Sequence, residues 1–194
     1  MLAIFLIVVV DLIGFGIIIP LLPFYGEHFQ ADPQTVGLLM ATYSLAQFIS
    51  APLWGRLSDH AGRRPVLLLS LAGAAAAYVW LAFADALWML FMARALGGLM
   101  AGNISAAFAY MADITTKENR AKGMGLIGAA FGIGFILGPA IGGILAGPDP
   151  LTADYRSPAL AAAGLSLFAL LLGIVRLPES LSAEVRARAA AMPR

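Results

Sequence analysis

Residues 55–65 read Gly55-Arg56-Leu57-Ser58-Asp59-His60-Ala61-Gly62-Arg63-Arg64-Pro65 and separate two long apolar runs. Three of the chain's 12 lysine and arginine residues lie in this stretch, although only 12% of all residues are charged. Because a soluble domain has about 25% charged residues, the composition is typical of a membrane protein. The stretch is therefore predicted to be a loop in water that connects two membrane-spanning helices.

The remaining composition excludes several kinds of site. Of the 194 residues, 61% are hydrophobic and none is cysteine, which excludes disulfides, thiol catalysis and cysteine-bound metals. Both histidines, His28 and His60, lie near loops, which argues against a histidine metal cluster and against the buried serine–histidine pair of an intramembrane protease. We therefore expect no enzymatic activity, and no metal, other cofactor or nucleic acid among the partners.

Six apolar segments are long enough to cross a bilayer, which takes about 20 residues per helix. A polar linker or tail follows them at residues 177–194. The predicted fold class is an all-α integral membrane protein with six transmembrane helices. These helices are expected at residues 2–24, 34–56, 64–84, 87–112, 121–147 and 158–176.

The basic residues lie almost entirely on one side of these six segments. Loops 56–64 and 113–122 and the tail are basic, whereas the alternate connections contain only Arg156. Lysine and arginine are enriched in loops on the cytoplasmic side. Both termini are therefore predicted to be cytoplasmic.

Two charged residues interrupt the apolar segments. Asp11 lies near the middle of the first segment and Arg94 lies within the fourth. A carboxyl group inside a membrane marks a functional site by default, although Asp11 could also be a protonated residue that packs helices. At about 1.5 Å per residue the two residues reach similar depths, so an Asp11–Arg94 pair, direct or through water, is geometrically possible. Arg94 could instead extend outward or bind a backbone carbonyl.

The fifth segment is unusually rich in glycine. Small residues four apart on a membrane helix allow another helix to approach closely, and the whole pattern exceeds what one packing face requires. The residues that form it include Gly125, Gly128, Gly132, Gly134, Gly138, Pro139, Gly142 and Gly143.

Two of these stretches resemble signatures of the major facilitator superfamily. Gly55, Asp59, Gly62, Arg63 and Arg64 are similar to its loop motif G-x-x-x-D-(R/K)-x-G-(R/K)-(R/K), with His60 in a position where a permanent cation is usual. His60 either makes this loop sensitive to pH or is a tolerated surface change. The glycine-rich segment resembles G-x8-G-x3-G-P-x2-G-G of the drug:proton antiporters, at Gly125, Gly134, Gly138, Pro139, Gly142 and Gly143.

Weaker matches point to the tetracycline-efflux branch of the family. Arg94 and Gly98 resemble a motif of the fourth helix, and the first segment with Asp11 and Ile19-Pro20-Leu21-Leu22-Pro23 is similar to that branch. The resemblance implies one six-helix half of the family fold, built as a 3+3 inverted repeat, in the plasma (bacterial inner) membrane. It implies proton-coupled efflux of a small, drug-like or tetracycline-like molecule, with Asp11 and Arg94 at the proton and substrate site.

The resemblance also implies a cytoplasmic gate. Asp59 and Arg63 would belong to a charge network that includes Asp113, the expected partner of Arg63, and Arg120 matches an arginine that begins the fifth helix. Full transporters of this family have two six-helix halves, so the partner is either a missing carboxyl-terminal half or a second copy of this chain. Uptake of a sugar or organic ion, and a non-transporting membrane assembly protein derived from a transporter half, are the alternative functions. Substrate identity and proton versus sodium coupling stay open.

Overall fold

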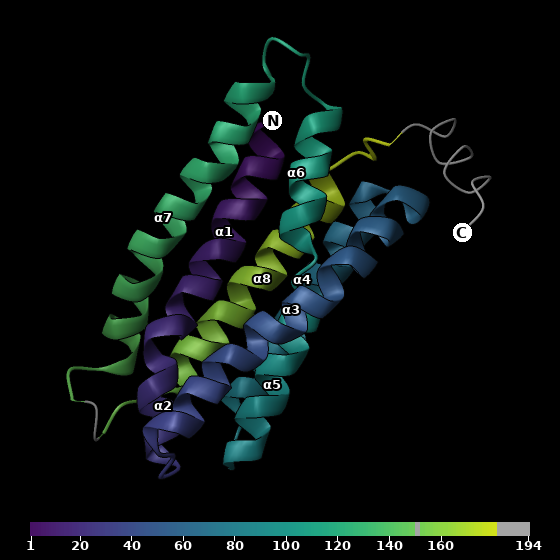
Figure 1. Cartoon of the computed structure of the whole chain (residues 1–194). Coiled ribbons are helices and arrows are strands. Elements are labelled where there is room, and N and C mark those ends of the chain that lie inside the picture. Colours follow the sequence, from purple (N-terminus) through teal and green to yellow (C-terminus); the bar gives the residue numbers. More distant parts are fainter. Residues whose placement is uncertain (150–151, 182–194) are drawn as a thin grey trace.

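The computed structural model describes residues 1–149 and 152–181, and these form a bundle of helices (Figure 1). Most of the predicted tail, residues 182–194, lies outside the described residues. The helices are α1 (Leu2–Ile18), the 3-10 helix η1 (Ile19–Leu21), α2 (Leu22–His28), α3 (Pro33–Ala61), α4 (Arg63–Ala82), α5 (Leu87–Leu99), α6 (Asn103–Asp113), α7 (Arg120–Ala146) and α8 (Arg156–Arg176).

In the described part, six helical segments are long and apolar enough to cross a membrane, as the predicted fold class requires. The first consists of α1, η1 and α2 and continues to His28, beyond the predicted end at residue 24. Its two prolines do not end it, because Pro20 lies in the 3-10 turn and Pro23 in the first turn of α2. A helix tolerates proline in its first turn, where the missing N–H has no partner to lose.

The predicted loop around Gly62 is shorter than expected. Helix α3 continues through Asp59 to Ala61 and α4 begins at Arg63, so the turn between them is the single residue Gly62. Gly62 has φ 111°, a conformation that costs glycine little because it has no Cβ. The charges predicted to lie in a connecting loop are therefore held on the ends of two helices.

The fourth apolar segment, expected as a helix over residues 87–112, is a candidate membrane span at Leu87–Asp113, but it is not one continuous helix. A turn at Met100–Gly102 divides it into α5 and α6. Side chains from neighbouring helices bind carbonyls beside the turn: Trp54 Nε1 donates to Leu99 O at 2.5 Å, and Ser70 Oγ donates to Met100 O at 2.5 Å. In a membrane an interrupted helix is tolerated where such donors satisfy the freed carbonyls.

The packing of the six segments follows the expected 3+3 inverted repeat. Helix α1 packs mainly on α7 and α8, while α5 packs mainly on α3 and α4, and α4 packs on α8 (Figure 1). Exchanging the first three segments with the last three maps each of these contacts onto another or onto itself. This exchange symmetry is the one that an inverted repeat produces.

The buried core has two apolar clusters with a polar level between them. Along α1, the first cluster includes Ile4, Ile7, Val8 and Leu12, and the second begins at Ile17. Asp11 is thus buried where the first cluster ends. We call the end of the bundle that carries Met1, Gly62 and residues 177–181 the N-terminal end (Figure 1).

Candidate functional site

A cavity of about 160 Å³ lies at this polar level. Asp11 of α1, Tyr43 of α3, Arg94 of α5 and Asn103 of α6 all line it. The structure therefore brings together the two charged residues of the apolar segments, which are 83 positions apart in the sequence. The rest of the lining is largely apolar, and includes Phe15, Leu81 and Phe131.

Asp11 is held by uncharged donors. Its side chain, in a residue only 7% exposed, accepts a hydrogen bond from Asn103 Nδ2 and another from Ser166 Oγ of α8 at 3.4 Å. Asn103 is the first residue of α6, so the positive end of that helix dipole lies beside the carboxyl. A buried carboxyl with neutral partners can exist either ionised or protonated, which is what a proton carrier requires.

The direct Asp11–Arg94 ion pair does not form. Among the described residues, the ion pairs within 4.0 Å are Arg63–Asp59 and Arg63–Asp113. The Arg94 guanidinium lies instead over the ring of Tyr43, 4.3 Å from its centroid. Aromatic faces attract cations through the ring quadrupole, and this contact takes the place of the predicted pair.

Small residues of α5 and of the turn before α6 allow α3 to approach the cavity. A Cβ on Gly98 would collide with the Tyr43 carbonyl and with Ala46, and a Cβ on Gly102 would collide with the Trp54 ring. The Gly98 carbonyl also accepts a hydrogen bond from Ser50 Oγ at 3.2 Å. Gly98 therefore sets how closely the helix that carries Tyr43 can lie to the helix that carries Arg94.

The glycine-rich helix α7 uses one of its faces against α1. A Cβ on Gly134 would lie 2.6 Å from Leu12 Cβ, one on Gly138 2.6 Å from Gly16 backbone atoms, and one on Gly142 2.6 Å from Ile17 O. The chain continues as one α-helix through Pro139. The structure places this face directly beside the α1 backbone that carries Asp11.

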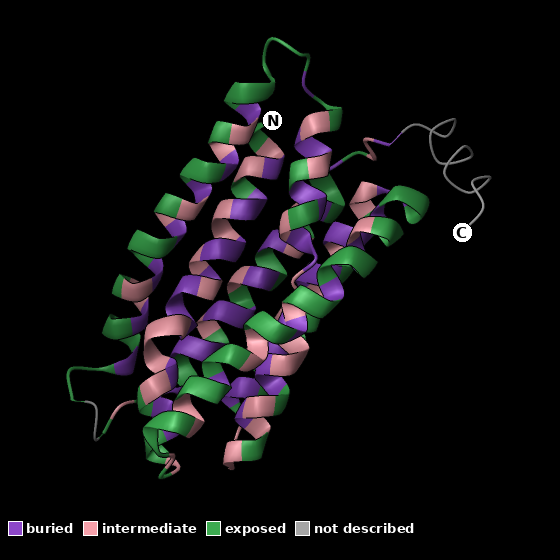
Figure 2. Cartoon of the chain, in the orientation of Figure 1, coloured by how far each residue is buried: buried purple, intermediate pink, exposed green. Residues whose placement is uncertain are grey.

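The other motif glycines do not take part in this contact. Nothing lies within 4 Å of a Cβ added to Gly125 or Gly143, and the same holds for Gly128 and Gly132. In Figure 2 the side of α7 away from α1 is largely exposed. The motif glycines therefore lie on two faces of α7. Within the described part of the chain, α1 packs against one of these faces.

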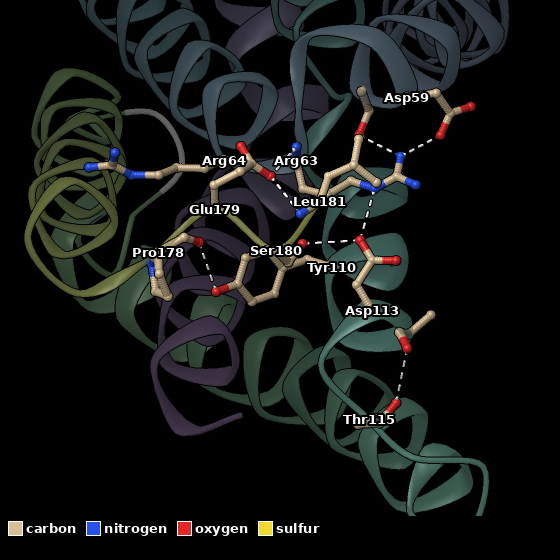
Figure 3. Close-up of polar contacts among 12 residues, drawn as sticks. Asp59, Arg63, Arg64, Tyr110, Asp113, Thr115, Pro178, Glu179, Ser180 and Leu181 are labelled. Carbon is tan, nitrogen blue, oxygen red and sulfur yellow. Dashed lines mark hydrogen bonds and ion pairs between the residues drawn. The ribbon is translucent and has the colours of Figure 1, made fainter. Parts of the chain in front are cut away.

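A second group of charged residues lies at the N-terminal end, around Arg63 (Figure 3). Arg63 Nη1 donates to Asp59 Oδ1 at 2.6 Å and to Ser58 Oγ at 3.0 Å, and Nε donates to Asp113 Oδ2 at 3.2 Å. The Arg63 side chain is 13% exposed, so these pairs are partly desolvated. This arginine connects the end of α3, the start of α4 and the end of α6.

Glu179 belongs to this group, and the sequence reasoning missed it. Its two carboxylate oxygens accept the backbone N–H groups of Arg63 at 2.9 Å and Arg64 at 3.2 Å, at the first turn of α4 (Figure 3). Ser180 Oγ donates to Asp113 Oδ2 at 3.0 Å, and Leu177 and Leu181 are buried. Residues 177–181, predicted as part of a polar linker, are packed against the bundle.

Three other predicted gate residues lie at the margin of this group. Arg120 is the first residue of α7 and donates to the Ala112 carbonyl at 3.3 Å rather than to a carboxylate. His60 is exposed, and its Nδ1 lies 2.8 Å from the Arg56 carbonyl. Gly55 lies inside α3, with nothing within 4 Å of an added Cβ.

Replacing Glu179 by alanine is expected to lower the free energy of unfolding by about 1 kcal/mol, because the first turn of α4 loses its acceptors and a favourable charge. For a chain of this size the melting temperature should fall by about 2–4 °C, measured by thermal unfolding in detergent. Glu27→Ala, at an exposed position of α2, is the control and should melt like the parent. Equal melting of all three proteins would contradict the capping role.

Several residues that line the cavity or bind Asp11 carry a signal that sequence reasoning did not use. Asn103 and Ser166 are polar residues inside apolar segments, and Tyr43 is an aromatic residue with a hydroxyl in a third segment. Only the depth of each residue was available, however, and depth does not say which faces of the helices meet.

Within the described residues, no three histidine, cysteine or acidic side chains are grouped as metal ligands.

Comparisons with known proteins agree with this architecture. The chain is 41% identical over 182 residues to the tetracycline resistance protein, class C, of Escherichia coli, a match that covers 92% of this chain and 45% of that protein. It is 35% identical to multidrug resistance protein 2 of Bacillus subtilis, covering 91% of this chain and 43% of the relative. The chain thus spans about half the length of the curated relatives it matches.

A solved structure and a family match complete the comparison. The structure of the human organic anion transporter MFSD10 (TETRAN) superposes with a TM-score of 0.80 at 31% identity, over 95% of this chain and 48% of that chain. Residues 4–192 match the family described as Major Facilitator Superfamily. Because this match extends over nearly the whole sequence, the chain is an integral membrane protein that belongs to the Major Facilitator Superfamily.

Proposed function

We propose that this chain is the amino-terminal half of a proton-coupled efflux transporter, which exchanges protons for a small drug-like or tetracycline-like molecule. The observation that carries the proposal is the buried Asp11 carboxyl, which lines a cavity and is held by neutral donors. The similarity to tetracycline and multidrug resistance proteins supports efflux as the direction of transport.

The mechanism follows from the chemistry of Asp11. The carboxyl takes up a proton when the cavity is open to the outside and releases it when the cavity opens to the cytoplasm. A bound substrate and the proton compete for the same carboxylate, so one leaves as the other binds. Rocking of two six-helix halves supplies the alternating access, and the second half also supplies the missing wall of the substrate cavity.

The second half is either a carboxyl-terminal six-helix half or a second copy of this chain. An unlike carboxyl-terminal half is favoured, because α7 leaves Gly125, Gly128, Gly132 and Gly143 open on a face that α1 does not use. We call this chain together with the half that completes it the complete transporter. Both termini are proposed to lie in the cytoplasm of a bacterium, with the bundle in the inner membrane, because the N-terminal end carries the basic loops.

The proposal is tested by purifying this chain from its native membrane, identifying the half that accompanies it, and assaying tetracycline movement in everted vesicles. We expect tetracycline uptake into these vesicles when their interior is more acidic than the medium, and we expect a protonophore to abolish it. Uptake that follows a sodium gradient would overturn proton coupling, and no movement of tetracycline under either gradient would overturn the efflux assignment. A self-associated chain that transports alone would identify a homodimer.

Uptake of an organic ion is the second candidate, because the structural relative MFSD10 is described as an organic anion transporter. The direction of a pH-driven flux separates the two, since an importer moves its substrate in the opposite direction to an efflux pump under the same gradient. A chain that purifies with no transport partner and moves no solute would instead indicate an assembly protein.

The Arg63 group is proposed to be the cytoplasmic gate that stabilises the outward-facing state. Replacing Arg63 by aspartate adds a carboxylate to those of Asp59, Asp113 and Glu179, and transport should fall to background. Adding Asp113→Arg restores one attractive pair, so partial recovery of transport is expected in the double variant, measured in the same vesicles. The single variant Asp113→Arg serves as the control. A double variant no better than either single one would count against the pair.

A further inference from the structure

The cavity contains a cation that has no anionic partner in the described chain. Arg94 is only 6% exposed, its Nε is buried without a hydrogen-bond partner, and no described carboxylate lies within 4.0 Å of its guanidinium. Its contact is the ring face of Tyr43. An aromatic face offsets only part of what a guanidinium loses on leaving water.

An oxygen anion is the group that would complete this arrangement. The guanidinium is planar and presents its N–H donors as a fork, which matches the two oxygens of a carboxylate. Such charge-assisted hydrogen bonds are strongest where water is excluded. Arg94 is therefore prepared for an anionic group that enters the cavity.

The same cavity contains a carboxyl that Arg94 does not neutralise. Asp11 receives hydrogen bonds from Asn103 and Ser166, yet an ionised carboxylate has about four acceptor sites. It can therefore accept further bonds from an ammonium group or from another donor. Two opposite charges line one cavity without direct contact, and a molecule with separated charges of its own complements both.

The volumes indicate which part of a molecule fits. At about 160 Å³ the part of the cavity that this chain lines is smaller than the roughly 300–1,000 Å³ of a site for a drug-sized ligand, so we assign the polar end of the molecule to it. A second hollow of about 270 Å³ shares Phe15, Tyr43 and Arg94 with it. Apolar residues such as Ile19, Leu22 and Met40 line that hollow, which suits the apolar body of the same molecule.

We propose that the cavity is a subsite for dipolar substrates, in which Arg94 on the Tyr43 ring binds an oxygen anion and Asp11 binds the cationic or donor group. The inference rests on the proposed efflux function and narrows its substrate class to molecules that carry both charges. It also preserves exchange, because the cationic end of the substrate and the proton compete for Asp11.

The test measures equilibrium binding to the purified complete transporter, so that it does not depend on transport. Three probes share one aromatic scaffold and carry an ammonium group, a carboxylate group, or both. The parent should bind the dipolar probe about tenfold or more tightly than either singly charged probe, since one charge-assisted contact is worth about that factor. Arg94→Gln should weaken the dipolar and carboxylate probes about tenfold and leave the ammonium probe within about twofold.

Arg156→Gln is the matched control, because Arg156 also lies over an aromatic ring, 4.2 Å from the Phe83 centroid, but outside the cavity. It should bind all three probes like the parent. Arg94→Lys keeps the charge without the fork and should lose less affinity than Arg94→Gln.

Equal affinity of the parent for the three probes, or equal loss for all three in Arg94→Gln, would overturn the subsite. The second result is expected if a carboxylate of the completing half already pairs with Arg94. If the three probes bind with the expected order of affinities but no pH-driven flux is observed, the efflux proposal alone is overturned and the subsite stands.

Discussion

Asp11→Asn in the complete transporter is expected to abolish proton-driven efflux, with flux in everted vesicles falling to the level of vesicles without the protein. Asparagine has nearly the shape of protonated aspartic acid and can still bond to Asn103 and Ser166, whose side chains contact Asp11. It cannot bind or release a proton. The variant should therefore fold, yet lose the step that couples the two fluxes.

The readout that separates coupling from misfolding is substrate exchange without a gradient. Asp11→Asn should still exchange labelled for unlabelled substrate across the membrane, because the asparagine side-chain oxygen can still accept a hydrogen bond from the substrate's donor end. Asp85→Asn, an exposed carboxyl outside the cavity, is the matched control and should keep full proton-driven efflux. Unchanged proton-driven flux in Asp11→Asn would refute the assignment of Asp11 as the proton carrier.

Gly138→Ala is expected to destabilise the contact between α1 and α7 strongly. The added Cβ would lie 2.6 Å from Gly16 Cα and 2.8 Å from the Ile17 nitrogen, and these backbone atoms cannot move as a flexible side chain could. Helices α1 and α7 must separate along their contact, and overpacking of this kind costs about 1–3 kcal/mol. A fall in melting temperature of several degrees is expected, measured in detergent.

Two matched variants test whether position or the methyl group matters. Gly164→Ala in α8 and Gly132→Ala in α7 each add a Cβ with nothing within 4 Å, so both should melt at or slightly above the parent temperature. Gly132→Ala also faces away from α1, so weaker recovery of the completing half with it would point to that face as the contact between halves. A melting temperature for Gly138→Ala equal to that of Gly164→Ala would contradict the close contact.

The helical architecture follows from the sequence because a bilayer permits few alternatives. Apolar segments of about 20 residues must form helices to satisfy their backbone groups, so composition and length predict the six segments and the all-α class. The prediction of one unbroken helix in the fourth segment failed, because side chains of other helices bind the backbone carbonyls that the break frees. The break between α5 and α6 depends on Trp54 and Ser70, which lie far from it in the sequence.

The glycines of α7 also show what the sequence predicts and what only contacts between helices decide. The spacing of Gly134, Gly138 and Gly142 predicts that some helix approaches closely, because nothing larger fits such a face. The spacing does not identify the approaching helix, since any of the other helices could pack against a face made of glycines. The structure assigns the face to α1 and leaves Gly125 and Gly143 open.

The sequence by itself determined the six apolar segments, the side on which the basic residues lie, and the two charged residues inside the apolar segments, since length, hydropathy and charge are local properties. Only the tertiary structure decided the partners of those charges. Asp11 is bound by Asn103 and Ser166, Arg94 by the Tyr43 ring, and Glu179 by the first turn of α4. Which groups meet depends on the rotation of each helix about its axis, and packing between distant segments sets that rotation.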